Sequence, residues 1–218
     1  MRQERGRDRA AIGFTVKSGW ASAVLVAGSS TSLRVVASRR IDLSDPAIPE
    51  SRQPYHAGFG TARKTGPELS QLIAGVRRFG RRSVTGVIRD YRGAGYPLRG
   101  AGVVVGSLID PAQIANDHIR IHALEGRLFR YVVQDAAARS GLPCLIWRER
   151  DLSTLAVRNL KLREQEIRNT LAALGREVVG PWRTEQKSAA LAAWLAMTRR
   201  LPAARLIRDR GLNGRGHR

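Results

Sequence analysis

Two histidines and a nearby glutamate could together bind a metal ion. His118, His122 and Glu125 follow Asn116 and Asp117 and are spaced so that they fall on one side of a helix. Imidazole groups one helical turn apart can share a metal ion. The sequence therefore offers His118, His122 and Glu125 as candidate metal ligands. Two plainer interpretations compete with this one: histidines that border an apolar stripe and support the fold, and a helical ion pair between His122 and Glu125.

A segment that mixes aromatic and basic residues precedes this cluster in the chain. It contains Tyr55, His56, Phe59, Arg63 and Lys64. Aromatic rings can stack on unpaired bases and cationic groups can contact phosphate, so Tyr55, His56 and Lys64 are candidate nucleic-acid contacts. The alternative is that Tyr55 and Phe59 only attach a long loop to the domain.

Arginine dominates the charge of the chain. The formal net charge is +20, and because there are four lysines, 34 of the 38 basic residues are arginine. Arginine forms bidentate contacts with phosphate and stacks on bases, so the charge predicts DNA or RNA as the partner. Codon bias in a GC-rich genome and an ordinary solvated face are the competing explanations. The densest candidate surface consists of Arg77, Arg78, Arg81 and Arg82, with Arg89 and Arg92 downstream.

The remaining composition narrows the class of protein. Nothing approaches an apolar run of about 18 residues, and the charged first residues lack the apolar segment of a signal peptide, so we expect a soluble, cytoplasmic protein without membrane contact. Cys144 is the only cysteine, which excludes a disulfide framework and a Cys-based zinc cluster. The glycines at 93–102 do not form a dinucleotide motif, so no ATP or NAD site is assigned. We predict one domain over residues 11–198, between basic flexible segments at 1–10 and 199–218.

The pattern of apolar and turn residues predicts the elements that must position these side chains. Runs at 11–19, 20–28 and 33–43 predict an antiparallel meander of three strands, and the prolines between Leu43 and Pro67 predict a long loop. The order of all the elements predicts an α/β fold, a mixed sheet of three antiparallel strands and two further strands covered by helices. The later elements are a helix from Pro67, a strand at 103–106, the longest helix at 112–139, a strand at 142–147, a helix at 153–174 with Ser153 as N-cap, and an alanine-rich helix from Thr184.

This element order is similar to that of the ribonuclease H-like superfamily, and two stretches resemble one branch of it, the RuvC-type junction resolvases and the YqgF-type pre-ribosomal RNA nucleases. In the YqgF-type family a strand leads into Asp-Glu-Arg-Leu-(Ser/Thr)-Thr. Residues 148–154 here read Arg-Glu-Arg-Asp-Leu-Ser-Thr, with Asp151 as an extra residue. The last helix of these families begins with a carboxylate ahead of an alanine-rich stretch. Glu185 takes that place in this chain, and Ser188 replaces a second acid.

The first strand departs from the family pattern. Family members resemble Leu-Gly-Leu-Asp-x-Gly-Thr, whereas residues 12–18 read Ile-Gly-Phe-Thr-Val-Lys-Ser, so Thr15 stands where the resemblance implies a metal-binding aspartate. Two-metal phosphodiester hydrolysis needs several convergent carboxylates, and Lys17 would oppose a dication. The resemblance therefore leaves Glu149 and Glu185 as catalytic candidates, with magnesium as the cofactor if the protein cleaves.

Three functions are compatible with these residues. We expect a nucleic-acid-binding protein with a ribonuclease H-like fold whose metal-dependent cleavage is lost or much reduced. The alternative is an active magnesium-dependent nuclease in which Glu125 or Asp42 joins the two glutamates. The third is a scaffold that binds an acidic protein. Plainer roles also stay open, a surface ion pair for Glu149 and a favourable interaction with the helix dipole for Glu185.

Overall fold

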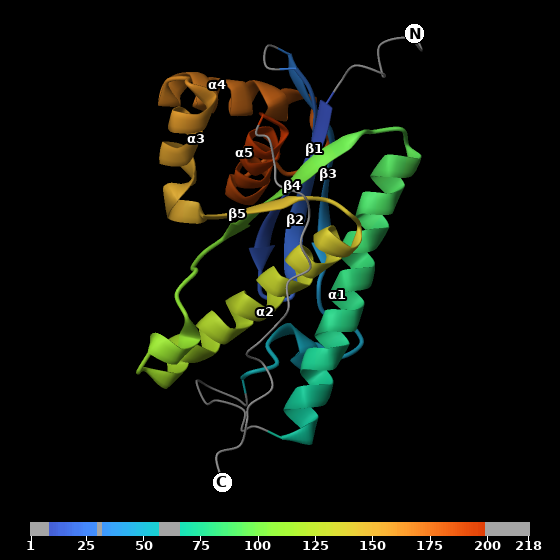
Figure 1. Cartoon of the computed structure of the whole chain (residues 1–218), viewed down its shortest axis with the longest axis vertical. Coiled ribbons are helices and arrows are strands. Elements are labelled where there is room, and N and C mark those ends of the chain that lie inside the picture. The colour runs from blue at the N-terminus through green and yellow to red at the C-terminus, as the bar shows by residue number, and fades with distance from the viewer. Residues whose placement is uncertain (1–8, 30–31, 57–65, 199–218) are drawn as a thin grey trace.

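A five-stranded mixed sheet forms the centre of the protein (Figure 1). The computed structural model describes residues 9–29, 32–56 and 66–198. In the sheet order β3-β2-β1-β4-β5, the first three strands pair antiparallel, and β4 and β5 run parallel to β1. The predicted α/β class is confirmed. The strands are β1 Arg9–Lys17, β2 Trp20–Gly28, β3 Leu33–Asp42, β4 Leu98–Val105 and β5 Cys144–Arg148.

Helices cover both faces of this sheet. Helices α1 and α2 share one hydrophobic core with the first face, and α3, α4 and α5 share a second core with the other. The protein is thus a three-layer α/β/α arrangement. The helices among the described residues are α1 Pro67–Gly93, α2 Asp117–Arg139, α3 Leu152–Leu160, α4 Glu164–Leu174 and α5 Thr184–Thr198, with short 3-10 turns η1 Pro49–Arg52, η2 Pro111–Gln113, η3 Glu149–Asp151 and η4 Gly175–Glu177.

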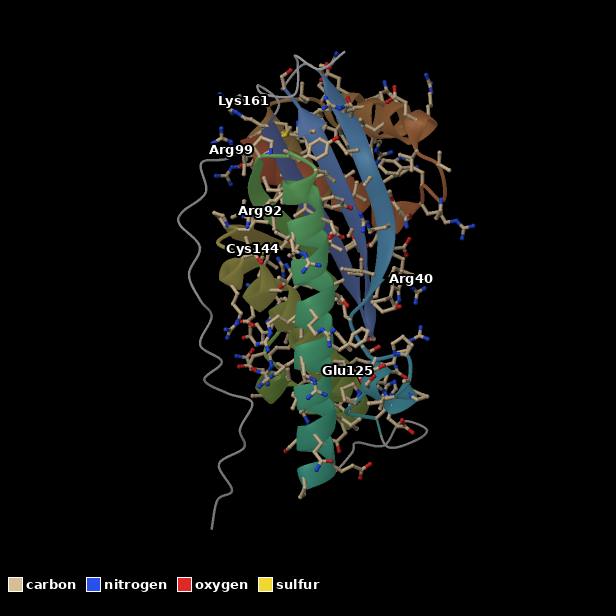
Figure 2. All side chains as sticks on the ribbon, turned by 90° about the vertical axis from the view of Figure 1, so that its right-hand side faces the viewer. Arg40, Arg92, Arg99, Glu125, Cys144 and Lys161 are labelled. Atoms are coloured by element: carbon tan, nitrogen blue, oxygen red, sulfur yellow. The ribbon has the colours of Figure 1, made fainter. Side chains whose placement is uncertain are left out.

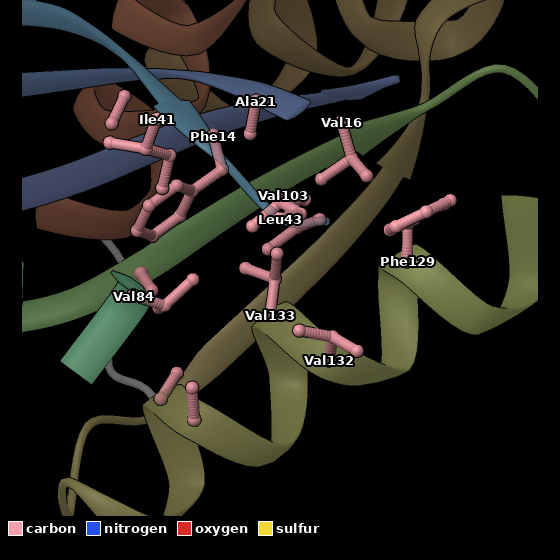
Figure 3. Packing of buried hydrophobic residues seen from close by; sticks show 14 of the residues in the cluster. Phe14, Val16, Ala21, Ile41, Leu43, Val84, Val103, Phe129, Val132 and Val133 are labelled. Atoms are coloured by element: carbon pink, nitrogen blue, oxygen red, sulfur yellow. The ribbon is translucent and has the colours of Figure 1, made fainter. Parts of the chain in front are cut away.

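The side chains of alternate residues of β1 are buried in the two hydrophobic cores on opposite faces of the sheet. Phe14 is fully buried on the side of α1 and α2, where Figure 3 shows it among large aliphatic side chains such as Leu43 and Val103. Burying a phenylalanine stabilises the fold by about 1.5 to 3 kcal/mol. Ala11 belongs to the opposite core, against α5. The period of two in a strand therefore also directs Thr15 to the α5 side.

Two glycines allow α5 to lie unusually close to the sheet. A Cβ atom on Gly13 would lie 1.7 Å from the carbonyl oxygen of Ala189, and one on Gly102 would lie 2.4 Å from that of Ala192. The small residues of α5 present a flat surface to β1 and β4, as the alanine-rich sequence predicted. This close packing fixes the first turn of α5 near the end of β1.

Two predicted helices are shorter than expected. The helix predicted at 112–139 begins at Asp117, because the side chain of Asn116 caps its first turn by accepting a hydrogen bond from the main-chain N–H of Ile119 at 3.0 Å. At 27 residues α1 is therefore longer than α2, which has 23. The helix predicted at 153–174 is broken at Lys161, whose φ of 57° is left-handed and ends α3. Asp151, not Ser153, takes the N-cap position of α3.

The predicted segment boundaries also change slightly. β1 begins at Arg9, so Arg9 and Ala10 belong to the sheet and not to the basic segment predicted at 1–10. The loop predicted between Leu43 and Pro67 contains η1. No helix in the described part of the chain has the length and apolar character needed to cross a membrane.

Candidate nucleic-acid interface and the sheet edge

The carboxyl ends of three parallel strands meet at one edge of the sheet. β1 ends at Lys17 and β4 at Val105, and Val105 is paired with Arg148 at the end of β5. Glu149 follows immediately. In open α/β sheets, ligands and catalytic groups gather at this edge.

Thr15 joins β1 to the start of α5. Its side chain is 1% exposed, and its Oγ1 donates a hydrogen bond to the main-chain oxygen of Glu185 at 2.8 Å. The structure therefore places Thr15 beside the main chain of Glu185. The threonine hydroxyl is engaged with the backbone, where the family pattern has a charged carboxylate.

An ion pair occupies the same edge. The Nζ atom of Lys17 lies 3.4 Å from Oε2 of Glu149, and both side chains are about one-third exposed, at 35% and 34%. The extra acid of this region, Asp151, is paired with Arg148 and Arg150. The acidic groups that follow β5 are thus neutralised by cationic side chains of the protein itself.

These residues do not fit a pair of magnesium ions. Such a centre needs several carboxylates that converge without a competing cation. Here Thr15 contributes no charge, and the ammonium of Lys17 is paired with Glu149. Within the described ranges, neither Glu149 nor Glu185 belongs to a group of three side chains that could hold a metal ion.

The two acids considered as replacements do not lie beside Glu149. Asp42 lies at the same carboxyl end of the sheet as Lys17, but on the outer strand β3, with β2, β1 and β4 between it and β5. Its Oδ1 atom is 3.9 Å from Nε of Arg40. Glu125 lies on α2, on the face away from α5, and is completely buried. Asp42 is therefore separated from Glu149 by the width of the sheet, and Glu125 by its position on α2.

A second cluster gathers three of the four histidines of the chain. Nε2 of His118 and Nε2 of His122 are 3.3 Å apart, and His56 lies beside them, with ring centroids 6.4 Å and 5.0 Å away. Nδ1 of His56 is 2.7 Å from Oε1 of Glu125. The structure thus places Glu125 against His56, whereas the sequence had grouped it directly with His118 and His122.

Burial and charge act on the protonation of this cluster. Burial raises the pKa of Glu125, although the hydrogen bond and the charge of His56 act in the opposite direction. Partial burial lowers the pKa of His122, and the neighbouring His118 and His56 add to that effect. Both shifts favour the uncharged form of their group.

The aromatic and basic segment is only partly described. Tyr55 is 7% exposed and belongs to the core on the side of α1 and α2. Its ring is therefore buried and is not available to stack on a base of a bound nucleic acid. His56 is half-buried and faces α2. The predicted contact Lys64 lies outside the described residues, as do Phe59 and Arg63.

Arginines project from α1 along much of its length (Figure 2). Arg78, Arg82 and Arg89 are exposed and fall on one stripe of the helix. Their side chains form no ion pair or hydrogen bond with any other described residue. Arg81, in contrast, lies 3.8 Å from Asp135, and Arg92 donates to the main-chain oxygen of Ser140 at 2.7 Å.

Part of this stripe borders a hollow. Arg78 and Arg82 line a cavity of about 410 Å³ between α1 and residues 45–51, together with Asp45 and Glu50. The lining of this cavity therefore carries both basic and acidic side chains. Arg89 lies about two helical turns beyond Arg82, outside the cavity lining.

The arrangement of this mixed sheet and its covering helices is similar to the fold of two solved RuvC structures. RuvC of Thermus thermophilus in complex with a Holliday junction substrate aligns over 86% of this chain and 91% of its own, with a TM-score of 0.51 and 13% sequence identity. A second Thermus thermophilus RuvC structure aligns over 86% and 92%, with a TM-score of 0.50 and 12% identity. No protein family matches the sequence, and no curated protein matches it.

Proposed function

We propose that this protein binds structured DNA or RNA, mainly through contacts to the phosphate backbone, and has lost or much reduced the metal-dependent cleavage of its fold relatives. The observation that carries this proposal is the Lys17–Glu149 ion pair beside Thr15 at the strand ends. A lysine ammonium there supplies the positive charge with which a metal ion would otherwise neutralise the glutamate.

The binding half of the proposal rests on charge. A net charge of +20 on 218 residues creates a field that attracts polyanions. The exposed stripe of Arg78, Arg82 and Arg89 can contact phosphates without first breaking ion pairs within the described structure. A fold relative, the Thermus thermophilus RuvC, has been captured with a Holliday junction, which supports testing branched DNA first.

The test combines binding and cleavage in the same samples. The purified protein is titrated with fluorescent duplex, single-stranded and four-way-junction DNA and with matching RNAs, over a salt series, with Mg²⁺ or Mn²⁺ present, and each sample is then run on a gel. We expect binding that weakens steeply with salt and a nucleic acid that stays intact.

Two results would overturn the proposal. Metal-dependent cleavage that disappears in Glu149→Gln would establish the nuclease alternative. The observation that favours this alternative is that Glu149 and Glu185 both lie at the strand-end edge. No binding even at low salt would leave the charge without a nucleic-acid partner and favour a scaffold for an acidic protein.

A further inference from the structure

We infer that His56, His118 and His122 form a binding site for a divalent transition-metal ion of the zinc class, in which Glu125 is the positioning residue that orients His56. This site is separate from the strand-end edge and does not depend on the proposed nucleic-acid binding. It also revises the sequence prediction, since His56 replaces Glu125 as the third ligand.

The two helical histidines already have the separation that a shared ion requires. Tetrahedral Zn²⁺ with bonds of about 2.0 to 2.1 Å holds two ligand nitrogens about 3.3 Å apart. Nε2 of His118 and Nε2 of His122 are separated by 3.3 Å, and their rings are perpendicular, with centroids 4.6 Å apart. A spacing of four residues places these two side chains one turn apart on α2, so the helix itself sets the distance between their Nε2 atoms.

His56 completes the set from a different part of the chain. One ligand nitrogen from each of the three rings lies within 4.8 Å of the others. His56 comes from the segment after η1, and α2 begins more than 60 residues later, at Asp117. An ion bound here would therefore join that segment to α2.

Glu125 has the position and chemistry of an outer-sphere carboxylate. Histidines that bind metals commonly donate their other ring N–H to a carboxylate, which fixes the ring and its tautomer. Oε1 of Glu125 lies 2.7 Å from Nδ1 of His56, so coordination by His56 goes through Nε2. An ionised carboxylate at this completely buried position is costly unless a positive charge lies nearby. A dication held by the three histidines supplies that charge.

The ligand set selects the class of ion. Imidazole nitrogens suit zinc, copper, nickel and cobalt, whereas magnesium prefers oxygen ligands. Three protein ligands leave a fourth tetrahedral position for water or another small ligand. His118 and His122 are exposed, so an ion can enter from solvent without unfolding the protein.

The experiment measures metal binding by the full chain without an affinity tag and without nucleic acid. Zn²⁺ is titrated against a competing chromophoric chelator, and Co²⁺ is titrated while its visible absorption is recorded. We expect one equivalent of each ion, strong Co²⁺ absorption typical of four-coordinate geometry, and a rise in Tm with Zn²⁺.

Variants distinguish this site from general metal affinity. His118→Ala, His122→Ala and His56→Ala should each abolish stoichiometric binding, and Glu125→Gln should weaken it about 10- to 100-fold. The matched control is His217→Ala, which removes the fourth histidine of the chain and should leave binding unchanged. Because His118 and His122 are exposed, their variants should melt at the metal-free wild-type Tm, which keeps the test independent of folding.

The site would be refuted by weak, multi-equivalent binding that survives His118→Ala or His122→Ala. Full-strength binding by His56→Ala would equally refute the three-histidine site. The nucleic-acid titration gives a separate readout, so either proposal can fail while the other stands.

Discussion

At the scale of single residues, Thr15 and Lys17 determine the charge at the strand-end edge. Thr15 donates to the main chain of Glu185, and Lys17 pairs with Glu149. Changing Thr15 to aspartate and Lys17 to alanine would add one negative charge and remove one positive charge beside that glutamate. These substitutions therefore test whether local charge is what excludes a metal ion.

We expect Thr15→Asp/Lys17→Ala to bind Mn²⁺ at least about tenfold more tightly than the parent protein, because the local charge changes by two units. Electron paramagnetic resonance of free Mn²⁺ measures this, in a His122→Ala background that removes the histidine site. Thr15→Val is the control, since it loses the hydroxyl but adds no charge. Equal binding by the double variant and this control would show that geometry, not charge, excludes the ion.

Cys144 provides a pH-related prediction at the same scale. Burial raises the pKa of its thiol from 9.0 to about 12. Because the thiolate is the reactive form, its population near pH 8 falls by about a thousandfold. We expect iodoacetamide to alkylate the native protein at least about 100-fold more slowly than the protein unfolded in guanidinium, with mass spectrometry as the measurement. Equal rates in the two states would contradict the raised pKa of the thiol.

At the scale of elements, the contact of α5 with the sheet positions the strand-end site. Gly13 and Gly102 allow the helix backbone to approach β1 and β4, and the first turn of α5 then meets Thr15. A larger residue at either position must displace the helix, since the atoms in the way belong to its backbone.

Gly13→Ala should lower the free energy of unfolding by about 3 kcal/mol or more, because its Cβ would lie 1.7 Å from the carbonyl oxygen of Ala189. Urea unfolding followed by circular dichroism measures the change. The matched control is Gly86→Ala on α1, where an added Cβ meets no atom within 4 Å and helix propensity should stabilise by about 0.5 to 1 kcal/mol. Similar stabilities for Gly13→Ala and the parent protein would show that α5 can move away without cost.

At the scale of the whole molecule, the question is whether the positive charge acts as a general field or through a defined surface. Arg78, Arg82 and Arg89 lie on α1, in one helical layer. Arg158, Arg163 and Arg168 lie on or beside α3 and α4, in the opposite layer, where Arg163 and Arg168 are paired with glutamates. Replacing either set removes the same charge, so the two triple variants form a matched pair.

We expect the α1 triple alanine variant to reduce the slope of log K against log salt for duplex DNA by about 2 to 3, since each lost phosphate contact removes about 0.9. The Arg158/Arg163/Arg168 variant should retain most of the parent slope. Fluorescence anisotropy over a salt series measures both. Equal losses in the two variants would show that net charge alone governs binding and that α1 is not the contact surface.

The sequence by itself determined those strands and helices that are specified by residues close together in the chain. Apolar, β-branched runs separated by short polar turns predicted the three-stranded meander, Pro67 marked the start of α1, and Thr184 marked the start of α5. The replacement of an expected aspartate by Thr15 was also visible in the chain. The breaks at Asn116 and Lys161 were missed because apolar periodicity continues across both, although one side-chain cap and one left-handed residue end the helices there.

Only the tertiary structure decided which distant residues act together. Lys17 and Glu149 are separated by 132 positions, and His56 and Glu125 by 69. Spacing along a helix could group His118 with His122, but it carried no signal for a ligand contributed by a loop that packs against that helix. Such pairs form only when the sheet brings its strand ends together and the helices close over it, because contact between distant residues is set by the packing of whole elements and not by local sequence.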